Sequence, residues 1–355
     1  MEKKKVICGV QQVGIGVRSV ADSWPWYKDI FGFDLKMFGD EGVAERMLPY
    51  TGGKPQPRYA ILVLNLRGGG GFEVWEPRGR ELNHISFTPE LGDYGIFACK
   101  VKSRNVHAAY VEMKKKGVNI LTAPCANPAG KEHFFVMDPW NNIFDVESDD
   151  YCFINEDKNT GGNNGAILGV SDMDKSVRFY SSILDYDKIE YDVTDTFEDL
   201  KGIPGGNYKL RRVMLSRSKP IEGPLSQIMG TSYIELVQKV GDGDRAPRKL
   251  YEGRLWGDPG FIHLCFDIRN MEEIRKAAAQ FGHEFVCDGG RDFKMGEANG
   301  HFTYIEDPDG TLIEFVETFR IPILKKLGVY LNLEGRDDSK PLPGWILKCL
   351  RFMKS

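Results

Sequence analysis

The sequence predicts an α+β protein built from four copies of one module, in which a strand is followed by a helix and three further strands. Three observations predict this class. One module near the C-terminus is well defined, its turn-and-carboxylate motif recurs at the same spacing, and weaker copies of the module precede it. The 355 residues suffice for two domains with cores of their own.

The best-defined module spans residues 260–317. Residues 261–268 have the alternation of a half-buried strand, and residues 271–280 have helical spacing. Gly282 ends the predicted helix. A turn at residues 307–310 (Asp-Pro-Asp-Gly) then leads into the last strand, because Pro presets φ and Gly accepts a positive φ.

Three weaker copies lie at about residues 11–77, 95–147 and 164–238, and we number the modules one to four in chain order. Asp138-Pro139 and Asp145 in module two have the same spacing as Asp307-Pro308 and Glu314 in module four. This shared spacing indicates a true internal repeat. Two long insertions, residues 39–58 and 192–209, are rich in Gly and Pro or otherwise polar and are predicted to be loops.

The pattern His-x-x-Phe-x-Ile beginning at His263, then a helix, a Gly and Asp-Pro-Asp-Gly-x-x-Ile-Glu ending at Glu314, resembles the vicinal oxygen chelate superfamily. That superfamily includes glyoxalase I, extradiol dioxygenases, methylmalonyl-CoA epimerase, and the bleomycin and fosfomycin resistance proteins. The resemblance implies that two βαβββ modules pair into a cupped half-barrel that holds a divalent metal. It is specific to the superfamily and not to one reaction.

Pairing of consecutive modules would give an N-terminal domain over residues 1–148 and a C-terminal domain over residues 165–318. Residues 149–164 are polar and rich in Gly and Asn, as expected of a linker. Residues 319–355 form an extension in which residues 343–355 predict an amphipathic helix. We expect this helix to pack on its own domain, with a membrane surface or a protein partner as alternatives.

The resemblance implies that metal ligands come from the first and last strands of each module. The C-terminal cup would then offer Glu235, His263 and Glu314, with Gly165 at the fourth position, and the N-terminal cup Gln12, Glu73 and Asp145, with Ile96 at the fourth. One imidazole between two carboxylates suits Zn²⁺, Ni²⁺, Co²⁺, Mn²⁺ or Fe²⁺. An all-oxygen set suits Mg²⁺ or Ca²⁺ better. We therefore expect His263, Glu314 and Glu235 to bind the metal, and the N-terminal cup to be degenerate.

The resemblance also implies a reaction. The metal would bind vicinal oxygens of a small substrate, and Glu235 or Glu314 would act as general base in a lyase, isomerase or epimerase. One alternative is an Fe(II) ring-cleaving dioxygenase, because Tyr304 and the turn before Glu314 resemble part of the extradiol signature. Such enzymes use two His, however, and Gly165 stands where the second belongs. A non-catalytic ligand-binding protein is the other alternative.

Composition excludes several further classes. The formal net charge of −4 provides no field for nucleic acid. The seven cysteines are odd in number and contain no CxxC pair, which predicts reduced thiols in a cytoplasmic protein. The short apolar run near the N-terminus is a poor signal peptide. The oligomeric state stays open.

Overall fold

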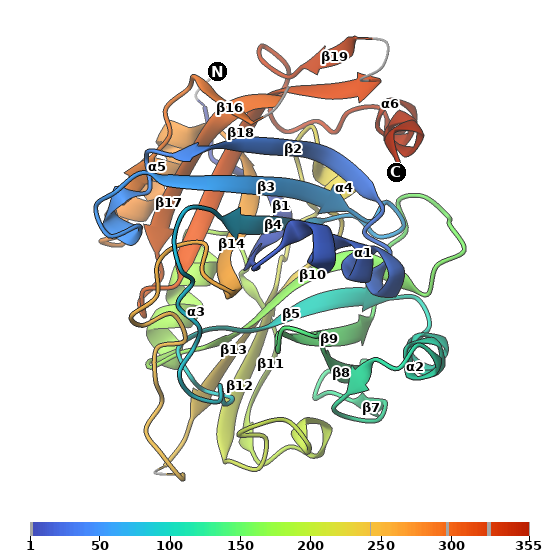
Figure 1. Ribbon diagram of the computed structural model, residues 1–355, viewed down its shortest axis with the longest axis vertical. Coiled ribbons are helices and arrows are strands. Elements are labelled where there is room, and N and C mark those ends of the chain that lie inside the picture. Colours follow the sequence, from blue (N-terminus) through green and yellow to red (C-terminus); the bar gives the residue numbers. More distant parts are fainter. Residues whose placement is uncertain (1–2, 242, 296–297, 325–327, 355) are drawn as a thin grey trace.

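The computed structural model describes residues 3–241, 243–295, 298–324 and 328–354. The strands of this part of the chain form two large mixed sheets, one above the other in Figure 1. In spatial order the first sheet contains β15 (Cys287–Asp288), β17 (Ala298–Glu306), β18 (Leu312–Leu324), β14 (Gly260–Arg269), β1 (Val6–Gly16), β4 (Gly71–Pro77), β3 (Gln56–Leu64) and β2 (Leu35–Ala44), with β16 (Phe293–Met295) beside β17 and β19 (Val329–Asn332) beside β18.

The second sheet is built in the same way. Its spatial order is β11 (Lys188–Asp195), β12 (Leu210–Ser216), β13 (Tyr233–Lys239), β10 (Thr160–Gly169), β5 (Gly95–Ser103), β9 (Ile143–Ser148), β8 (Glu132–Met137) and β6 (Asn119–Ile120), with β7 (Cys125–Ala126) beside β8. The predicted α+β class, with βαβββ modules in two half-barrels, is confirmed.

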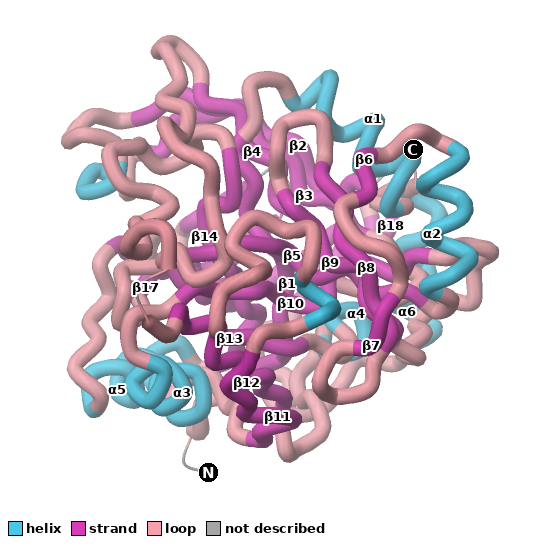
Figure 2. The backbone as a smooth tube through the Cα atoms, turned by 90° about the horizontal axis from the view of Figure 1, so that it is seen from below, coloured by secondary structure: helices cyan, strands magenta, loops and turns pink. Residues whose placement is uncertain are grey.

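Each module carries its predicted helix after its first strand. These helices are α1 (Val20–Phe31), α2 (Val106–Lys115), α3 (Met173–Ser182) and α5 (Met271–Gln280). Ser19, Asn105 and Asp172 cap the first three, since each side chain accepts a hydrogen bond from a backbone N–H of the first turn. Figure 2 shows most of the helices at the edges of the molecule, around a centre made of strands. None of the helices in the described ranges has the length and apolar character needed to cross a bilayer.

The strand order corrects the expected pairing of consecutive modules. Module one joins module four through antiparallel pairing of β1 with β14, and module two joins module three through antiparallel pairing of β5 with β10. In Figure 1 the blue strands of module one lie beside the orange strands of module four. Residues 1–148 and 165–318 therefore do not each close a half-barrel. Every module offers an equivalent first-strand edge, so the repeat pattern alone does not select the partner.

The predicted linker at residues 149–164 is too long, because β10 begins at Thr160. The Gly-rich start of β10 lies against the turn between β3 and β4. A Cβ atom on Gly162 would overlap the backbone oxygen of Gly69 there. Glycine is needed here so that two backbones can approach closely. A composition typical of a flexible linker thus belongs to a buried strand.

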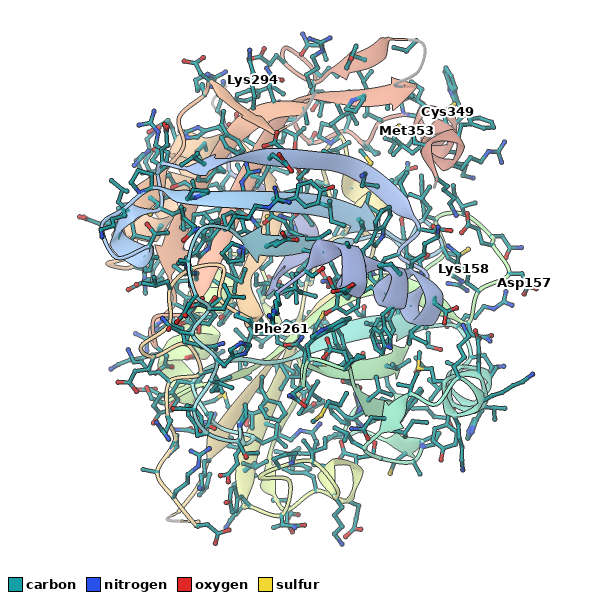
Figure 3. All side chains as sticks on the ribbon, in the orientation of Figure 1. Asp157, Lys158, Phe261, Lys294, Cys349 and Met353 are labelled. Atoms are coloured by element: carbon teal, nitrogen blue, oxygen red, sulfur yellow. The ribbon has the colours of Figure 1, made fainter. Side chains whose placement is uncertain are left out.

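The expected boundary at residue 318 cuts β18, which continues to Leu324 and pairs with β19. The predicted terminal helix forms as α6 (Gly344–Lys348) and a 3₁₀ turn (Cys349–Met353), labelled at Cys349 and Met353 in Figure 3. Leu347 and Leu350 are buried in a cluster with residues of β2, β3 and β18, so the helix packs on its own protein as expected. Residues 325–327 and 355 of the extension lie outside the described ranges.

The main core lies between the two sheets. It contains residues of β1, β4, β14 and β18 together with residues of β5, β9, β10 and β13. The rings of Phe144 and Phe261 lie 5.5 Å apart, and Figure 3 shows Phe261 between the sheets. Because successive side chains on a strand point to opposite faces, Val13 and Leu264 enter this core while Gln12 and His263 face the cup of the first sheet.

Candidate metal centre

Three potential metal ligands converge in the cup of the first sheet. Glu73 comes from β4, His263 from β14 and Glu314 from β18, and one ligand atom of each lies within 4.8 Å of the other two. His263 Nε2 is 3.1 Å from Glu314 Oε2 and 3.4 Å from Glu73 Oε2. All three side chains are buried. Such a group of buried carboxylates around an imidazole is the arrangement expected of a divalent metal site.

Gln12 of β1 completes a ring of four polar side chains. Its Nε2 donates to Glu314 Oε2 at 3.4 Å, while its Oε1 is buried without a hydrogen-bond partner. Neither ring nitrogen of His263 makes a well-aligned hydrogen bond. Unsatisfied buried polar atoms are rare in folded proteins and usually mark a missing partner. The residues present therefore fit a divalent cation, which Gln12, Glu73, His263 and Glu314 would hold. We call these four residues the metal centre.

The strand registers explain why these residues meet. Gly14 lies opposite Glu73 in the parallel pairing of β1 with β4, and opposite His263 in the antiparallel pairing of β1 with β14. Glu314 lies opposite Cys265, two residues after His263, in the parallel pairing of β14 with β18. The absence of a side chain at Gly14 leaves the space that the imidazole fills.

Two aromatic residues support the centre from beside it. The Tyr304 hydroxyl donates to Glu314 Oε1 at 2.7 Å and so fixes the orientation of that carboxylate. The indole of Trp256 lies nearly parallel to the His263 ring, with 6.4 Å between ring centroids and 17° between planes. Both residues are buried, so His263 and Glu314 are held in place by a rigid surround.

The electrostatics of the centre favour a cation between the carboxylates. Burial raises the pKa of Glu73. Burial also opposes ionisation of Glu314, but the attraction of His263 outweighs it and lowers the pKa of that carboxyl. Burial disfavours the charged imidazole, yet Glu314 and Glu73 together raise the pKa of His263 to about 9. A proton on His263 and a metal ion would thus compete for the same position.

The structure brings together His263 and Glu314 as expected, and adds Gln12 and Glu73, which the sequence had assigned to a separate cup. Glu235, the third expected ligand, lies instead on β13 in the second sheet. The reason is the pairing of module one with module four. We expected Gln12 and Glu73 to lie in a degenerate cup and Glu235 to be the third ligand, so the structure changes both the grouping and the set of candidate ligands.

The cup of the second sheet contains a lysine where the first has its metal centre. The Lys100 ammonium lies 2.5 Å from Asp145 Oδ2, 3.0 Å from Glu147 Oε2 and 3.0 Å from Glu235 Oε2. These four side chains, which we call the lysine cup, are all buried. Because the Lys100 ammonium lies between these carboxylates, Asp145 and Glu235 are already engaged with a cation that belongs to the chain itself. Lys100, on the strand beside Asp145, was the overlooked signal.

A wider buried network surrounds the lysine cup. Arg212 contacts Glu235 Oε1 at 2.7 Å and Asp199 Oδ2 at 2.8 Å, and His133 joins Asp145 at 2.9 Å to Asp199 at 3.1 Å. Burial opposes ionisation of Glu235, but Lys100 and Arg212 lower its pKa to about 2. The Glu235 carboxylate therefore stays charged and paired within this network.

The sequence matches a family model twice. The model of the Glyoxalase/Bleomycin resistance protein/Dioxygenase superfamily matches residues 9–146 and 164–315. The chain belongs to this superfamily. Each of the two superfamily copies contributes one module to each half-barrel, so the metal centre needs residues from both copies.

Solved structures of superfamily proteins share the fold. Glyoxalase I from Zea mays is 15% identical over 88% of this chain and 92% of its own, with a TM-score of 0.54. A putative dioxygenase from Bacillus subtilis is 13% identical over 89% of this chain and 86% of its own, with a TM-score of 0.56. At these identities the likeness shows the fold alone. No curated protein sequence matches the chain significantly.

The metal centre borders a cavity of about 340 Å³, which is large enough for a small molecule. Gln12, Glu73, Tyr304 and Glu314 line it together with Trp75. A ligand in this cavity would have direct access to the metal position. His301, the imidazole considered for a dioxygenase, also lines the cavity, but its Nε2 pairs with Asp288 Oδ1 at 2.6 Å.

Proposed function

We propose that this chain is a divalent-metal-dependent enzyme that moves a proton at a carbon next to two vicinal oxygens of a small substrate. Its reaction class would be lyase, isomerase or epimerase. The observation that carries the proposal is the buried ring of Gln12, Glu73, His263 and Glu314, three of which (Gln12, Glu73 and Glu314) line a cavity of substrate size. The metal would be Zn²⁺, Ni²⁺, Co²⁺, Mn²⁺ or Fe²⁺, because the donor set combines one imidazole with oxygen ligands.

A bound divalent ion would supply Lewis acidity, which stabilises negative charge on the substrate oxygens as the neighbouring C–H loses its proton. The chain would do the rest. Glu314 accepts and returns the proton, and the hydrogen bond from Tyr304 keeps its carboxylate in one orientation. Glu73, His263 and Gln12 would serve as the remaining metal ligands. Glu235, the other base expected from the sequence, lies in the lysine cup and has no part in this reaction.

The alternative of an Fe(II) dioxygenase receives less support. Oxygen activation of that kind uses two His and one carboxylate, and the metal centre contains only His263. Of the other described histidines, His133 lies in the second sheet between Asp145 and Asp199, and His301 is bound to Asp288. The other alternative is a ligand-binding protein without catalysis. Measurements of metal content and proton exchange distinguish it from the proposed enzyme.

The test has two stages. Protein purified without added metal or chelator is first examined by elemental analysis, beside the His263→Ala variant. We expect roughly one equivalent of a transition metal in the wild type and none in the variant. Both proteins are then incubated in D₂O with 2-hydroxy ketones, which carry vicinal oxygens beside an exchangeable C–H, and deuterium incorporation is followed by NMR.

Exchange by the wild type and not by His263→Ala would support the proposal. A metal-loaded wild type that catalyses no exchange with any ketone of the panel would count against proton transfer and favour a binding protein. Absence of metal from both proteins would contradict the proposal directly. Iron together with oxygen uptake on catechols would instead support the dioxygenase.

The expectation of a cytoplasmic location belongs to this proposal. All seven cysteines are free, and Cys8, Cys99, Cys265 and Cys287 among them are buried. Free thiols are typical of a reducing compartment. Fractionation of cells with an antibody against the chain tests this inference.

A further inference from the structure

The cavity beside the metal centre has one wall made of apolar side chains from three separate parts of the chain. We call the part of the cavity along this wall the apolar arm. Its lining consists of Phe38, Leu62, Leu64, Ile228, Met229 and Ile321. The first three come from β2 and β3, the next two from α4 (Ser226–Met229), and the last from β18. The arm is therefore a feature of the assembled fold and not of one loop.

Strand register connects the arm to the metal centre. Leu62 lies directly opposite the ligand Glu73 in the pairing of β3 with β4. Leu64, two residues further along the same face, lies opposite Gly71, where a Cβ atom would come within 2.5 Å of the Leu64 side chain. The absence of a side chain at Gly71 leaves room for the Leu64 side chain, which covers that part of the cavity wall. The apolar surface thus begins beside the metal centre and continues away from it.

Charged groups inside the cavity are already engaged. The Arg58 guanidinium is buried, pairs with Asp40 Oδ2 at 2.8 Å and lies over the ring of Trp75. Arg46 and Lys294 also line the cavity, but both are exposed, and Figure 3 shows Lys294 at the outer edge of the molecule. Among the described residues, no unpaired cation lies in the interior that would bind a buried anionic group of a substrate.

We infer that the substrate has a small oxygen-bearing head for the metal centre and a long apolar body that fills the apolar arm. This inference rests on the proposed function and names the substrate class of the same site. Burial of each methylene group of such a body would contribute free energy in proportion to its area. A strongly hydrated body, such as a sugar phosphate or a charged peptide, would leave its polar groups without partners against the arm.

The test uses straight-chain 2-hydroxy acids of three to twelve carbons, which share one chelating head and differ only in the tail. Binding to the metal-loaded protein is measured by calorimetry. We expect affinity to increase by about fourfold per methylene until the arm is full. Affinity that does not change with chain length would overturn the inference.

Variants at Met229 locate the effect. Met229→Trp should fill the arm, so that long acids bind no better than the three-carbon acid. Met229→Ala should instead move the plateau to a longer chain. Ile189→Trp adds the same indole at an exposed site on β11 and should leave the series unchanged. Retention of full chain-length dependence in Met229→Trp, folded by circular dichroism, would contradict the assignment of the arm.

Straight-chain carboxylates without the 2-hydroxyl separate this inference from the proposed function, because they cannot chelate through two vicinal oxygens. If the protein holds no metal, the proposed function fails, but a chain-length dependence with these carboxylates still supports the apolar arm. If metal is present and the shortest 2-hydroxy acid binds, a flat series contradicts the apolar arm alone.

Discussion

Gly14 lies directly opposite His263 where the first strand of the chain pairs with the first strand of the last module. A Cβ atom at Gly14 would lie 2.6 Å from Nδ1 and 2.7 Å from Nε2 of the imidazole, far inside contact distance. One strand thus supplies both the ligand Gln12 and the space in which the ligand His263 sits. The pairing of modules one and four is therefore evident from the fit of His263 against Gly14 as well as from the strand order.

Gly14→Ala should displace the His263 ring and weaken metal binding at least tenfold, with destabilisation of about 1–3 kcal/mol from overpacking. Metal titration with a competing chelator measures the affinity. Gly42→Ala is the matched control, because a Cβ atom on Gly42 meets its nearest neighbours at 3.5 Å. An unchanged metal affinity in Gly14→Ala would show that His263 is not held as described.

Lys100→Met should destabilise the protein by about 3–5 kcal/mol, because it removes the ammonium from among buried carboxylates and keeps the length of the side chain. Urea unfolding measures the difference. Lys188→Met makes the same change at an exposed ion pair with Glu190 and should leave the stability nearly unchanged. Equal losses in the two variants would contradict the structural role of the lysine cup.

The stabilising effect of His133 should depend on pH. Burial opposes its charge, but Asp145 and Asp199 raise the pKa of His133 to about 10, above its ordinary value of 6.5. Its contribution is therefore complete below pH 6.5 and is lost as the pH rises toward 10, with a slope of at most about 1.4 kcal/mol per pH unit.

Comparison of the wild type with His133→Gln isolates this effect. The difference in unfolding free energy should decrease steadily between pH 6.5 and 10. Lys102, whose pKa burial lowers to about 8, is present in both proteins and cancels in the difference. His107→Gln, at an exposed position, serves as the control. A difference that is constant across this range would exclude a charged His133 in the buried network.

Tyr304→Phe should keep the metal but slow proton exchange by on the order of tenfold, because Glu314 loses the hydrogen bond that orients it. Tyr180→Phe removes a comparable buried hydroxyl that donates to Asp307 at 2.9 Å and makes no contact with Glu314. Both variants should lose similar stability, and only Tyr304→Phe should change the exchange rate. Equal exchange rates in the two variants would exclude Tyr304 as a positioning residue.

Much of the fold could be predicted from the sequence, because local signals are sufficient for it. Helical spacing located the helix of module four, the internal repeat located those of the other three modules, and the Asp-Pro motif before Asp145 and Glu314 located two final strands. The family resemblance also indicated the strand positions of Gln12, Glu73, His263 and Glu314, although it assigned Gln12 and Glu73 to a cup that we expected to be degenerate. These features depend on neighbours along the chain, which a single sequence displays.

The grouping of the modules could not be predicted, because it depends on contacts between segments about 250 residues apart. Gly14 is informative only once its position opposite His263 is known. The Gly-rich start of β10 misled the domain division for a similar reason, since glycines that allow close contact and glycines of a linker look alike in composition. Lys100 is likewise informative only once the pairing of β5 with β9 places it beside Asp145.

The most direct measurement is the metal content of two variants with the same chemical change, Glu73→Gln and Glu235→Gln, each purified beside the wild type and analysed per mole of folded protein. We predict that Glu73→Gln loses most of its metal, because Glu73 belongs to the metal centre. Glu235→Gln should keep the wild-type content, because Glu235 pairs with Lys100 and Arg212. Loss of metal from Glu235→Gln together with retention in Glu73→Gln would contradict the account.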